Sequence, residues 1–485
     1  MDRLNVESLQ AGIMARVDQI RGVFAGARGV FPPTLRFAPS RLARPQGIAP
    51  RILLLTSTLG SGHVAATRAV EAALLARLPA ATISTLDFWS LMDAGVSHTI
   101  RNAYLRLVQE HPDLYDSVYQ LDQGLWRDLL ENNRLAPSVL TAALDFFAGA
   151  CTDGVLPKLD GEHHATDRLL LRLLCSSLPG RAKTAGANSV LLRRGLIKWS
   201  WARLAHRLET CLLAFAPDAI VATQMAPVAL LASVRKHRRL NIPAVGVPTD
   251  FGIHDFWMRR GIGMYCVAHE TVANLQSVEP SRKVVTGIPL MSGFRHPPSA
   301  CEARAALGLD PDRPVVLVPG GGLGLGVDAV VIRLLSGIPD VQLLALTAGN
   351  VAAQTALAPL AARYRSRLHL HGWTDRMEVF MRAADIVVGK PGGLTVAETL
   401  ACGRPLLATR SLRGQEGFNV RFLEQHRVGC LVSDEQLVPR IVSMLADRAE
   451  LARIQDRAWA LGRRDGADRI ADLVLATARQ TAEAT

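Results

Sequence analysis

The sequence predicts an α/β protein made of two doubly wound, parallel-sheet domains. The order strand, glycine-rich turn, helix occurs near residue 51 and again near residue 314. The strands are continuously apolar, which is typical of parallel strands buried on both faces. A chain of 485 residues is long enough for two full-size domains and an extension.

Composition indicates a globular protein of the cytoplasm. Hydrophobic residues make up 49% and charged residues 20% of the chain. The longest apolar runs fall short of the ~18 residues that span a bilayer. The start, Met1-Asp2-Arg3-Leu4, lacks the basic and long apolar segments of a secretory signal. Seven cysteines without a Cys-x-x-Cys pattern favour reduced thiols.

The net charge of +12 is compatible with nucleic acid, an anionic membrane surface or anionic substrates. No nucleic-acid motif with interleaved aromatic residues is present, so we expect no nucleic-acid partner. We also expect no metal site. Cys151, His163, His164 and Cys175 lack zinc-site spacing, and Asp310-Pro311-Asp312 is typical of a turn.

Residues 1–48 form a predicted N-terminal extension. Apolar residues recur there near helical spacing, and five prolines follow between Pro32 and Pro50. The pattern fits an amphipathic helix lying on a membrane and equally a helix packed on the protein's own body.

The first domain opens with a strand at Arg51–Thr56, a turn containing Gly60, Gly62 and His63, and a helix from about Val64 to Leu78. A second strand follows at 82–86. Because the positive end of a helix disfavours imidazolium, His63 is a candidate neutral general base. A solvated capping histidine is the simpler alternative.

Residues 88–213 are mostly helical, with a predicted insertion at about 121–213. Within it, Leu191–Leu208 is basic and amphipathic, with Trp199 and Trp201 among arginines. Such a helix suits a bilayer interface, but it is also typical of an ordinary surface helix.

Regular alternation then continues to a linker at about 287–298. Further strands of the first domain are expected at 219–222, 244–247, 265–268 and 283–286. A polar and aromatic loop, Pro248–Trp257, follows the strand at 244–247. In the second domain we expect strands at 314–318, 342–346 and 368–370 and a helical tail at 435–481.

Two stretches of the second domain indicate an anion site. Five glycines between Gly320 and Gly326 can form a cradle of backbone N–H groups, although a floppy turn is the alternative. The strand Ile386–Val388 leads into Pro391-Gly392-Gly393 and a helix expected to open at Thr395. That helix end suits a diphosphate. Glu398 then either binds the hydroxyls of a ribose or completes a capping box with Thr395.

Seven motifs in this order resemble those of monogalactosyldiacylglycerol synthases and bacterial processive diacylglycerol glucosyltransferases. They are Gly62-His63, Thr249-Asp250-Phe251 with His254 and Trp257, Gly287-Ile288-Pro289, Gly320–Gly324, Gly372–Met377, Lys390–Glu398 and Gly414–Asn419. The resemblance covers roughly residues 51–120 and 214–430. The transferase that adds N-acetylglucosamine to peptidoglycan precursors is more distantly similar.

The resemblance implies a GT-B fold, in which two Rossmann-like domains face a cleft. It implies domains at 49–296 and 297–468 and a helix at 469–485 that can cross back to the first domain. His63 and Asp250 would be catalytic: His63 would be the base or would help to orient the acceptor hydroxyl, and Asp250 would polarise His63 or hold the acceptor. Gly62, His254 and Trp257 would bind the acceptor. The implied donor-binding residues are Gly321, Gly322, Gly324, Trp373, Met377, Pro391, Gly392, Gly393, Thr395, Glu398, Gln415, Glu416 and Asn419.

The implied activity is inverting transfer of a hexose from UDP-glucose or UDP-galactose to a lipid hydroxyl, with diacylglycerol as the acceptor. We expect no cofactor and no metal, and peripheral attachment to the anionic inner face of the cell membrane. A nucleotide-sugar epimerase and a catalytically silent lipid- or nucleotide-binding relative are the alternatives. Thr67 departs from the pattern, where a small apolar residue is expected.

Overall fold

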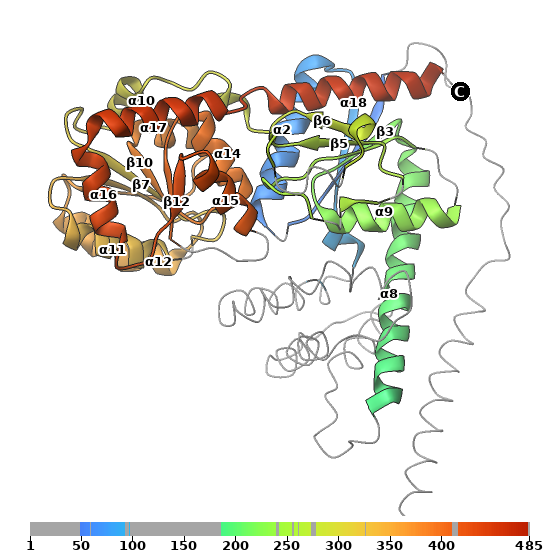
Figure 1. The fold of residues 1–485 in the computed structure, drawn as a ribbon. Helices are drawn as coiled ribbons and strands as arrows, with labels where there is room; N and C mark the ends of the chain where they lie inside the picture. The colour runs from blue at the N-terminus through green and yellow to red at the C-terminus, as the bar shows by residue number, and fades with distance from the viewer. Residues whose placement is uncertain are drawn as a thin grey trace, which may run out of the picture. The chain divides into compact units, whose positions relative to one another are not determined.

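The computed structural model describes residues 49–58, 60–92, 97, 186–238, 242–254, 257–259, 261–272, 278–324, 326–409 and 416–483 (Figure 1). The side chains of residues 186–200 and 236–238, and those after 480, are outside this description. The predicted extension at 1–48, most of the predicted insertion and Gln415 lie outside the described residues.

The first sheet is parallel and contains the strands expected in the first half of the chain. Its strand order is β2-β1-β3-β4-β5-β6. The strands are β1 (Arg51–Thr56), β2 (Thr82–Asp87), β3 (Ala219–Ala222), β4 (Ala244–Gly246), β5 (Met264–Val267) and β6 (Lys283–Val285). Residues 219–222 and 244–246 are fully buried, because helices cover both faces of the sheet.

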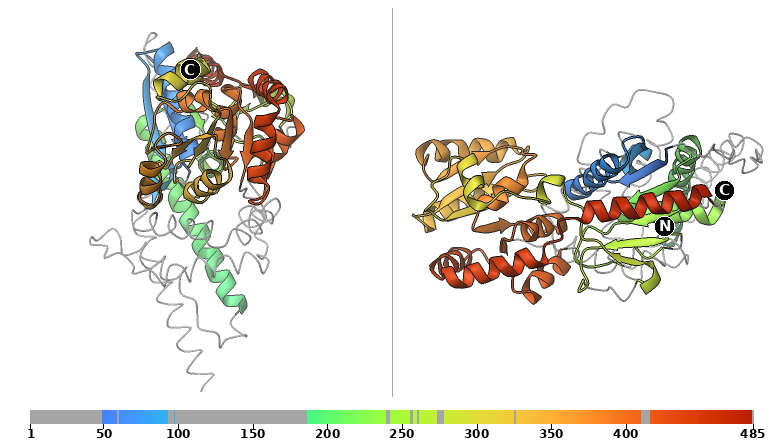
Figure 2. Two further views of the ribbon diagram at one scale, coloured as in Figure 1. Left: turned by 90° about the vertical axis from the view of Figure 1, so that its left-hand side faces the viewer. Right: turned by 90° about the horizontal axis from the view of Figure 1, so that it is seen from above.

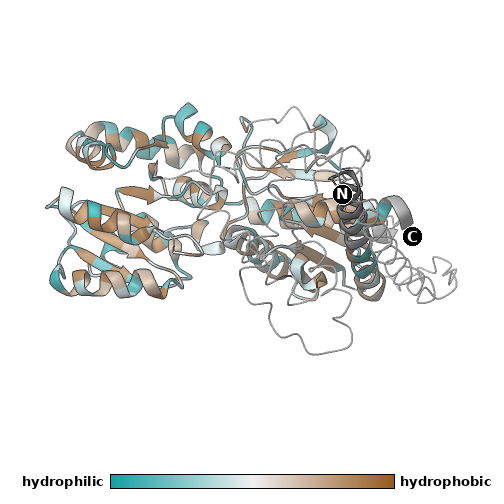
Figure 3. Ribbon diagram, turned by 90° about the horizontal axis from the view of Figure 1, so that it is seen from below, coloured by the Kyte–Doolittle hydropathy of each residue, from teal (hydrophilic) through white to brown (hydrophobic). Residues whose placement is uncertain are grey.

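The second sheet is also parallel, with the strand order β12-β11-β10-β7-β8-β9. The strands are β7 (Val315–Pro319), β8 (Gln342–Leu346), β9 (Leu368–His371), β10 (Ile386–Gly389), β11 (Leu406–Ala408) and β12 (Gly429–Leu431). In both sheets the order reverses at an internal strand, which places a ligand crevice at the carboxyl ends of the strands. Figure 3 shows the strands of both sheets in the hydrophobic colour.

The helices pack around these sheets (Figure 2). Those of the first half are α2 (Ser61–Arg77), α8 (Gly186–Phe215) and α9 (Met225–Arg238). Those of the second half are α10 (Ala300–Ala306), α11 (Val327–Gly337), α12 (Val351–Arg363), α13 (Met377–Ala383), α14 (Gly393–Ala401), α15 (Gly417–Gln425), α16 (Leu437–Ala446) and α17 (Arg448–Leu461). Short 3-10 turns lie at Phe88–Leu91, Pro280–Arg282 and Ser292–Phe294.

The last helix, α18 (Gly466–Glu483), belongs to the core of the first sheet. Ile470, Val474 and Leu475 pack in one buried cluster with Ile52 and Val70. The helix lies beside α2, and Arg77 of α2 forms ion pairs with Asp468 and Asp472. Helix α18 therefore packs on the first sheet.

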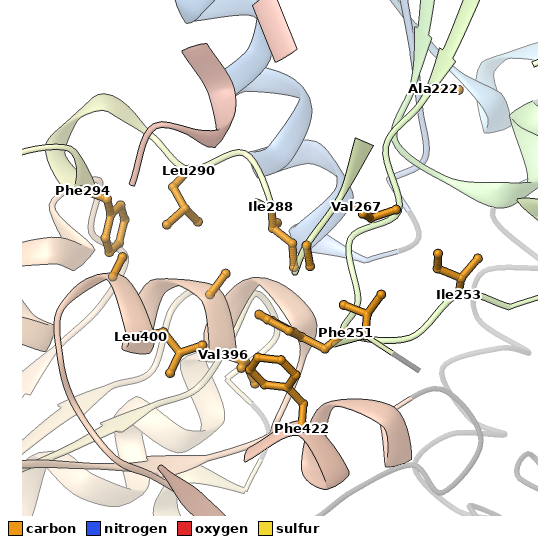
Figure 4. Close-up of a cluster of buried hydrophobic side chains, with 14 of the residues drawn as sticks. Ala222, Phe251, Ile253, Val267, Ile288, Leu290, Phe294, Val396, Leu400 and Phe422 are labelled. Atoms are coloured by element: carbon orange, nitrogen blue, oxygen red, sulfur yellow. The ribbon is translucent and has the colours of Figure 1, made fainter. Parts of the chain in front are cut away.

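One apolar cluster joins the two sheets. Figure 4 shows Phe251 and Leu290 of the first half packed against Leu400 and Phe422 of the second. The rings of Phe251 and Phe422 have centroids 4.3 Å apart. Because this cluster is buried, it fixes how the carboxyl ends of the two sheets meet.

Among the described residues, every helix is too short or too polar to cross a bilayer.

Candidate active site

His63 lies in the first turn of α2, which begins at Ser61. Its Nδ1 is 3.0 Å from the carbonyl oxygen of Thr223 and 3.1 Å from Oγ1 of Thr249. A carbonyl oxygen only accepts hydrogen bonds, so Nδ1 carries the proton and donates it. The neutral ring therefore presents Nε2 as an acceptor, which is the tautomer that a general base needs.

Burial lowers the pKa of His63, and this effect outweighs the opposing influences of Asp250 and the Thr223 carbonyl. The ring is consequently neutral at pH 7. Helix α2 has no side-chain cap, so His63 does not cap it. The solvated capping histidine considered for the sequence is thus wrong.

The hydrogen bonds of Thr67 explain why a threonine stands where a small apolar residue was expected. Its hydroxyl is 2.8 Å from the carbonyl oxygen of His63 and 2.8 Å from Oγ1 of Thr223, and its side chain is buried. Thr67 thereby ties the backbone of His63 to the strand end that orients the imidazole ring.

A small cavity lies beside His63, at the carboxyl ends of β1, β3 and β4. It is lined by His63, Gln224, Met225, Asp250, Gly252, His254, Trp257 and Phe418. The cavity brings together four residues that the resemblance assigns to catalysis or to the acceptor. It combines aromatic walls with carboxylate, amide and imidazole groups, a lining that suits a polar group attached to an apolar one.

The remaining predicted acceptor residue, Gly62, does not line this cavity. It lies instead next to the second half of the chain, where an added Cβ would stand 3.7 Å from Cβ of Leu394.

Asp250 is hydrogen-bonded to the second half of the chain. Its Oδ1 accepts a hydrogen bond of 2.9 Å from Nδ2 of Asn419. The Thr223 carbonyl orients the imidazole, and the charge of Asp250 raises the pKa of His63 against the larger effect of burial. Both roles considered for Asp250, polarising His63 and holding the acceptor, stay predictions. Asp250 lines the cavity beside His63.

Helix α14 begins at Gly393, two residues before the expected start, with Gly392 at the N-cap position. No side chain caps it, so Thr395 and Glu398 form no capping box, and that interpretation is wrong. The first N–H groups of α14 lack helical partners, as an anion site requires.

The carboxyl group of Glu398 lies in the second turn of α14. Burial, with the nearby Glu378, raises its pKa to about 8. A carboxyl group whose pKa is raised in this way by burial and a second carboxyl group is typical of a functional site, which favours a role in binding over a role in stability.

The glycine loop after β7 lies against the uncapped start of α2. Gly321 and Gly324 have φ angles of +58° and +63°, in the left-handed region that favours glycine. A Cβ at Gly322 would collide with the side chain of Ser61. Two helix N-termini, those of α2 and α14, therefore meet beside one glycine loop, and their dipoles favour an anion between them.

Gly393 is the point of closest approach between the two halves of the site. An added Cβ there would collide with the carbonyl oxygen of Thr249 and stand 2.8 Å from Oδ1 of Asp250. At Gly392 the nearest atom to an added Cβ is Oγ1 of Thr395, at 3.9 Å.

We therefore expect Gly393→Ala to reduce turnover at least about tenfold, since a shift of 1 Å at a reacting centre can cost about 100-fold. Gly263→Ala is the matched control, because an added Cβ there would stand 3.6 Å from the carbonyl oxygen of Ala244, an ordinary contact, and turnover should stay within about twofold. Steady-state rates and melting temperatures of the two variants check this. Equal rates in both variants would contradict it.

The remaining predicted donor residues are spread over three loop ends. Trp373 is 67% exposed, and Met377 begins α13. Pro391 precedes the uncapped end of α14. Glu416 is buried and pairs with Lys390 Nζ at 2.7 Å.

Asn419 is fully buried, and its amide is engaged by protein groups. Its Oδ1 accepts from the Phe251 N–H, and its Nδ2 donates to Asp250 and to the Pro391 carbonyl. Both amide hydrogens of Asn419 are therefore engaged by protein groups, and its contact with sugar hydroxyls stays a prediction.

Two family models match the chain. Residues 192–290 match the model of monogalactosyldiacylglycerol (MGDG) synthase, and residues 333–469 match the C-terminal domain of glycosyltransferase family 28. The processive diacylglycerol beta-glucosyltransferase of Bacillus licheniformis is 28% identical over 251 residues, which are 50% of this chain and 65% of that protein. The chain thus spans just under two thirds of that relative. The Bacillus cereus enzyme of the same name is 26% identical over 275 residues, covering 56% of this chain and 70% of that protein.

The chain is therefore similar to MGDG synthases and processive diacylglycerol glycosyltransferases. Its fold is also similar to Acinetobacter baumannii MurG, with a TM-score of 0.51, 13% identity and coverage of 88% of this chain and 99% of MurG. The glycotransferase of kitacinnamycin gives the same TM-score at 14% identity, covering 88% of this chain and 99% of that one. With two parallel six-stranded sheets, the fold is GT-B.

Four cavity residues were not assigned from the sequence. Gly252 is an unassigned position of the motif that runs from Thr249 to Trp257. Gln224 and Met225 follow β3, and their position directly after a buried strand was the available signal. Phe418 comes from α15 in the second half of the chain. No local pattern links it to Asp250 and Gly252, so only the tertiary structure places it there.

Proposed function

We propose that this protein transfers a hexose from a UDP-sugar to the hydroxyl group of a membrane lipid, with diacylglycerol as the acceptor. The observation that carries the proposal is the geometry of His63. Its tautomer is fixed by the Thr223 carbonyl, and its ring lines a cavity beside two uncapped helix N-termini. A base and an anion site in one crevice are what glycosyl transfer from a nucleotide diphosphate requires.

The step is a direct displacement that inverts the anomeric carbon. The lipid oxygen forms a bond to that carbon while the bond from the carbon to the diphosphate oxygen breaks. The hydroxyl proton moves to Nε2 of His63, and UDP leaves with the bonding electrons. The N–H groups of α14 and of the loop at Gly321 and Gly324 stabilise the charge that develops on UDP. The proposal therefore needs no metal ion or cofactor.

The donor would extend from the anion site across the ends of β9 and β10. Glu398 would accept hydrogen bonds from the ribose hydroxyls, and the loop carrying Trp373 and Met377 would hold uracil. Glu416, with Gln415 before it, would face the sugar hydroxyls. These residues suit glucose or galactose alike.

The lipid would be reached from the inner face of the membrane. The net charge of +12 favours an anionic surface. The basic segment at 191–208, which lies within α8, and the extension at 1–48 are the candidate contacts.

The decisive experiment is incubation with radiolabelled UDP-glucose or UDP-galactose and vesicles containing diacylglycerol, followed by chromatography of the lipid fraction. Label in a glycolipid supports the proposal. Interconversion of UDP-sugars without lipid would indicate the epimerase instead. UDP-sugar binding without any product would indicate a silent relative, and either result would contradict the proposal.

A further inference from the structure

The cavity beside His63 is completed by a residue from the second half of the chain. Phe418 lies on α15, and its ring covers the backbone of Gly252, where an added Cβ would collide with it. The guanidinium of Arg421 stands 4.7 Å from the centroid of the same ring. The ring is thus held between a backbone segment of the first half and a cation of its own helix.

The next residue, Asn419, fixes the neighbouring carboxylate. Its Nδ2 donates to Oδ1 of Asp250 at 2.9 Å and to the carbonyl of Pro391 at 3.0 Å. Its Oδ1 accepts from the N–H of Phe251 at 2.7 Å. One buried amide therefore joins the loop that carries the acceptor carboxylate to the loop that leads into the anion site.

We propose that Phe418 and Asn419 are positioning residues for the acceptor, although they belong to the half of the chain that binds the donor. This inference rests on the proposed function. Asn419 holds Asp250 in the orientation that meets the acceptor, and Phe418 forms the wall against which the acceptor lies. The acceptor site is complete only when the two halves are in contact.

The Phe418 ring also favours transfer to the lipid over hydrolysis of the UDP-sugar. Without the Phe418 ring, water can enter the cavity next to Nε2 of His63. Water then replaces the lipid hydroxyl: its oxygen bonds to the anomeric carbon, the bond to UDP breaks and His63 takes the proton. The products are free hexose and UDP, so the ratio of free hexose to glycolipid reports on the wall.

Phe418→Ala tests the wall. We expect its KM for diacylglycerol to rise about tenfold, equivalent to the ~1.4 kcal/mol of a lost apolar contact. The ratio of free hexose to glycolipid should also rise about tenfold. Phe418→Tyr keeps the ring and should retain the wild-type ratio. The Kd for UDP-glucose, measured by calorimetry, should stay within about twofold in both variants.

Asn419→Asp tests the hydrogen bond to Asp250 with little change of volume. It places an acceptor where Asp250 needs a donor, so kcat should fall about tenfold or more while the UDP-glucose Kd stays within about twofold. His426→Ala is the matched control. It removes a 2.7 Å contact to Thr271 just after the C-terminal end of the same helix and is not part of the cavity lining, so its product ratio should equal that of the wild type.

The outcomes separate this inference from the proposed function. A wild-type protein that releases UDP but forms no glycolipid would contradict the proposed acceptor. Glycolipid from the wild type, with an unchanged product ratio in Phe418→Ala, would overturn the inference alone. Loss of UDP-glucose affinity in parallel with turnover, in both Phe418→Ala and Asn419→Asp, would assign these residues to the donor and would also overturn it.

Discussion

His63→Ala is expected to reduce the rate of hexose transfer by about 10²- to 10⁴-fold, the usual contribution of a general base. The Kd for UDP-glucose should stay within about twofold, because the proposed donor contacts lie on the second sheet. Single-turnover transfer rates and calorimetry check the two parts. Unchanged transfer would contradict the catalytic assignment.

A suitable control is His206→Ala, since His206 is 66% exposed on α8. It removes an imidazole that lies outside the cavity lining, and we expect wild-type transfer.

The pH dependence of hexose transfer should also report on the neutral form of His63. Burial lowers the pKa of His63, and only the neutral ring can accept the proton. Transfer should therefore be constant above the ordinary histidine value of about 6.5 and fall only as the pH drops below it. This acid limb should be absent from the residual activity of His63→Ala. A wild-type transfer rate that already falls at a pH above 6.5 would contradict the lowered pKa of His63.

Glu398→Gln is expected to weaken UDP-glucose binding while stabilising the free protein at high pH. Two hydroxyl groups donating to a carboxylate contribute about 1.5–3 kcal/mol each, so affinity should fall at least about tenfold. In the free protein, the pKa of Glu398 is raised to about 8. The folded state then binds its proton more tightly than the unfolded state, so stability falls as pH rises from about 4.5 to about 8.

The amide removes this loss because it has no charge to bury. At pH 9 we expect Glu398→Gln to raise the free energy of unfolding by roughly 1–3 kcal/mol relative to the wild type. This range is already reduced to allow for the partial exposure of the side chain. Denaturant titrations at pH 5 and pH 9 measure it. The affinity of the wild type for UDP-glucose should rise between pH 6 and pH 8 as the carboxyl group ionises, with release of a proton.

Glu302→Gln provides the contrast, because Glu302 belongs to a true capping box. Its Oε2 accepts from the N–H of Ser299 at 2.8 Å, and Oγ of Ser299 accepts from the N–H of Glu302. We expect a modest loss of stability and unchanged UDP-glucose affinity. If Glu398→Gln behaved like Glu302→Gln, the binding role of Glu398 would be refuted.

The strands were the most predictable part of the fold. A run such as Ile386–Val388 is apolar at every position, and burial on both faces of a parallel sheet is the arrangement that hides all of it. Helix starts were less predictable. The Thr395 and Glu398 pair suggested a capped start, but α14 begins at Gly393 with no side-chain cap. Local capping preferences favour a helix that starts at Thr395. A free helix end that faces the crevice requires the uncapped start at Gly393.

Some features of the candidate site could likewise be predicted from the sequence, and others could not. His63 was accessible from sequence, because a histidine after a glycine turn at the end of a strand falls in the crevice of a doubly wound sheet. The orienting group was not accessible, since the Thr223 carbonyl is a backbone atom 160 positions away. The protein partners of Asn419 were not accessible from the sequence for a related reason. Its partners lie on a loop 168 and 169 positions earlier in the chain.

By itself, the sequence determined that two parallel sheets form, where their glycine turns lie and which imidazole stands at the crevice, because hydrophobic patterning and turn chemistry act over a few residues. Only the tertiary structure decided which nitrogen of His63 is free, that Gly393 must lack a side chain to meet Thr249, and that Phe418 and Asn419 complete the acceptor cavity. Those outcomes depend on packing between segments far apart in the chain, and local sequence carries no information about such contacts.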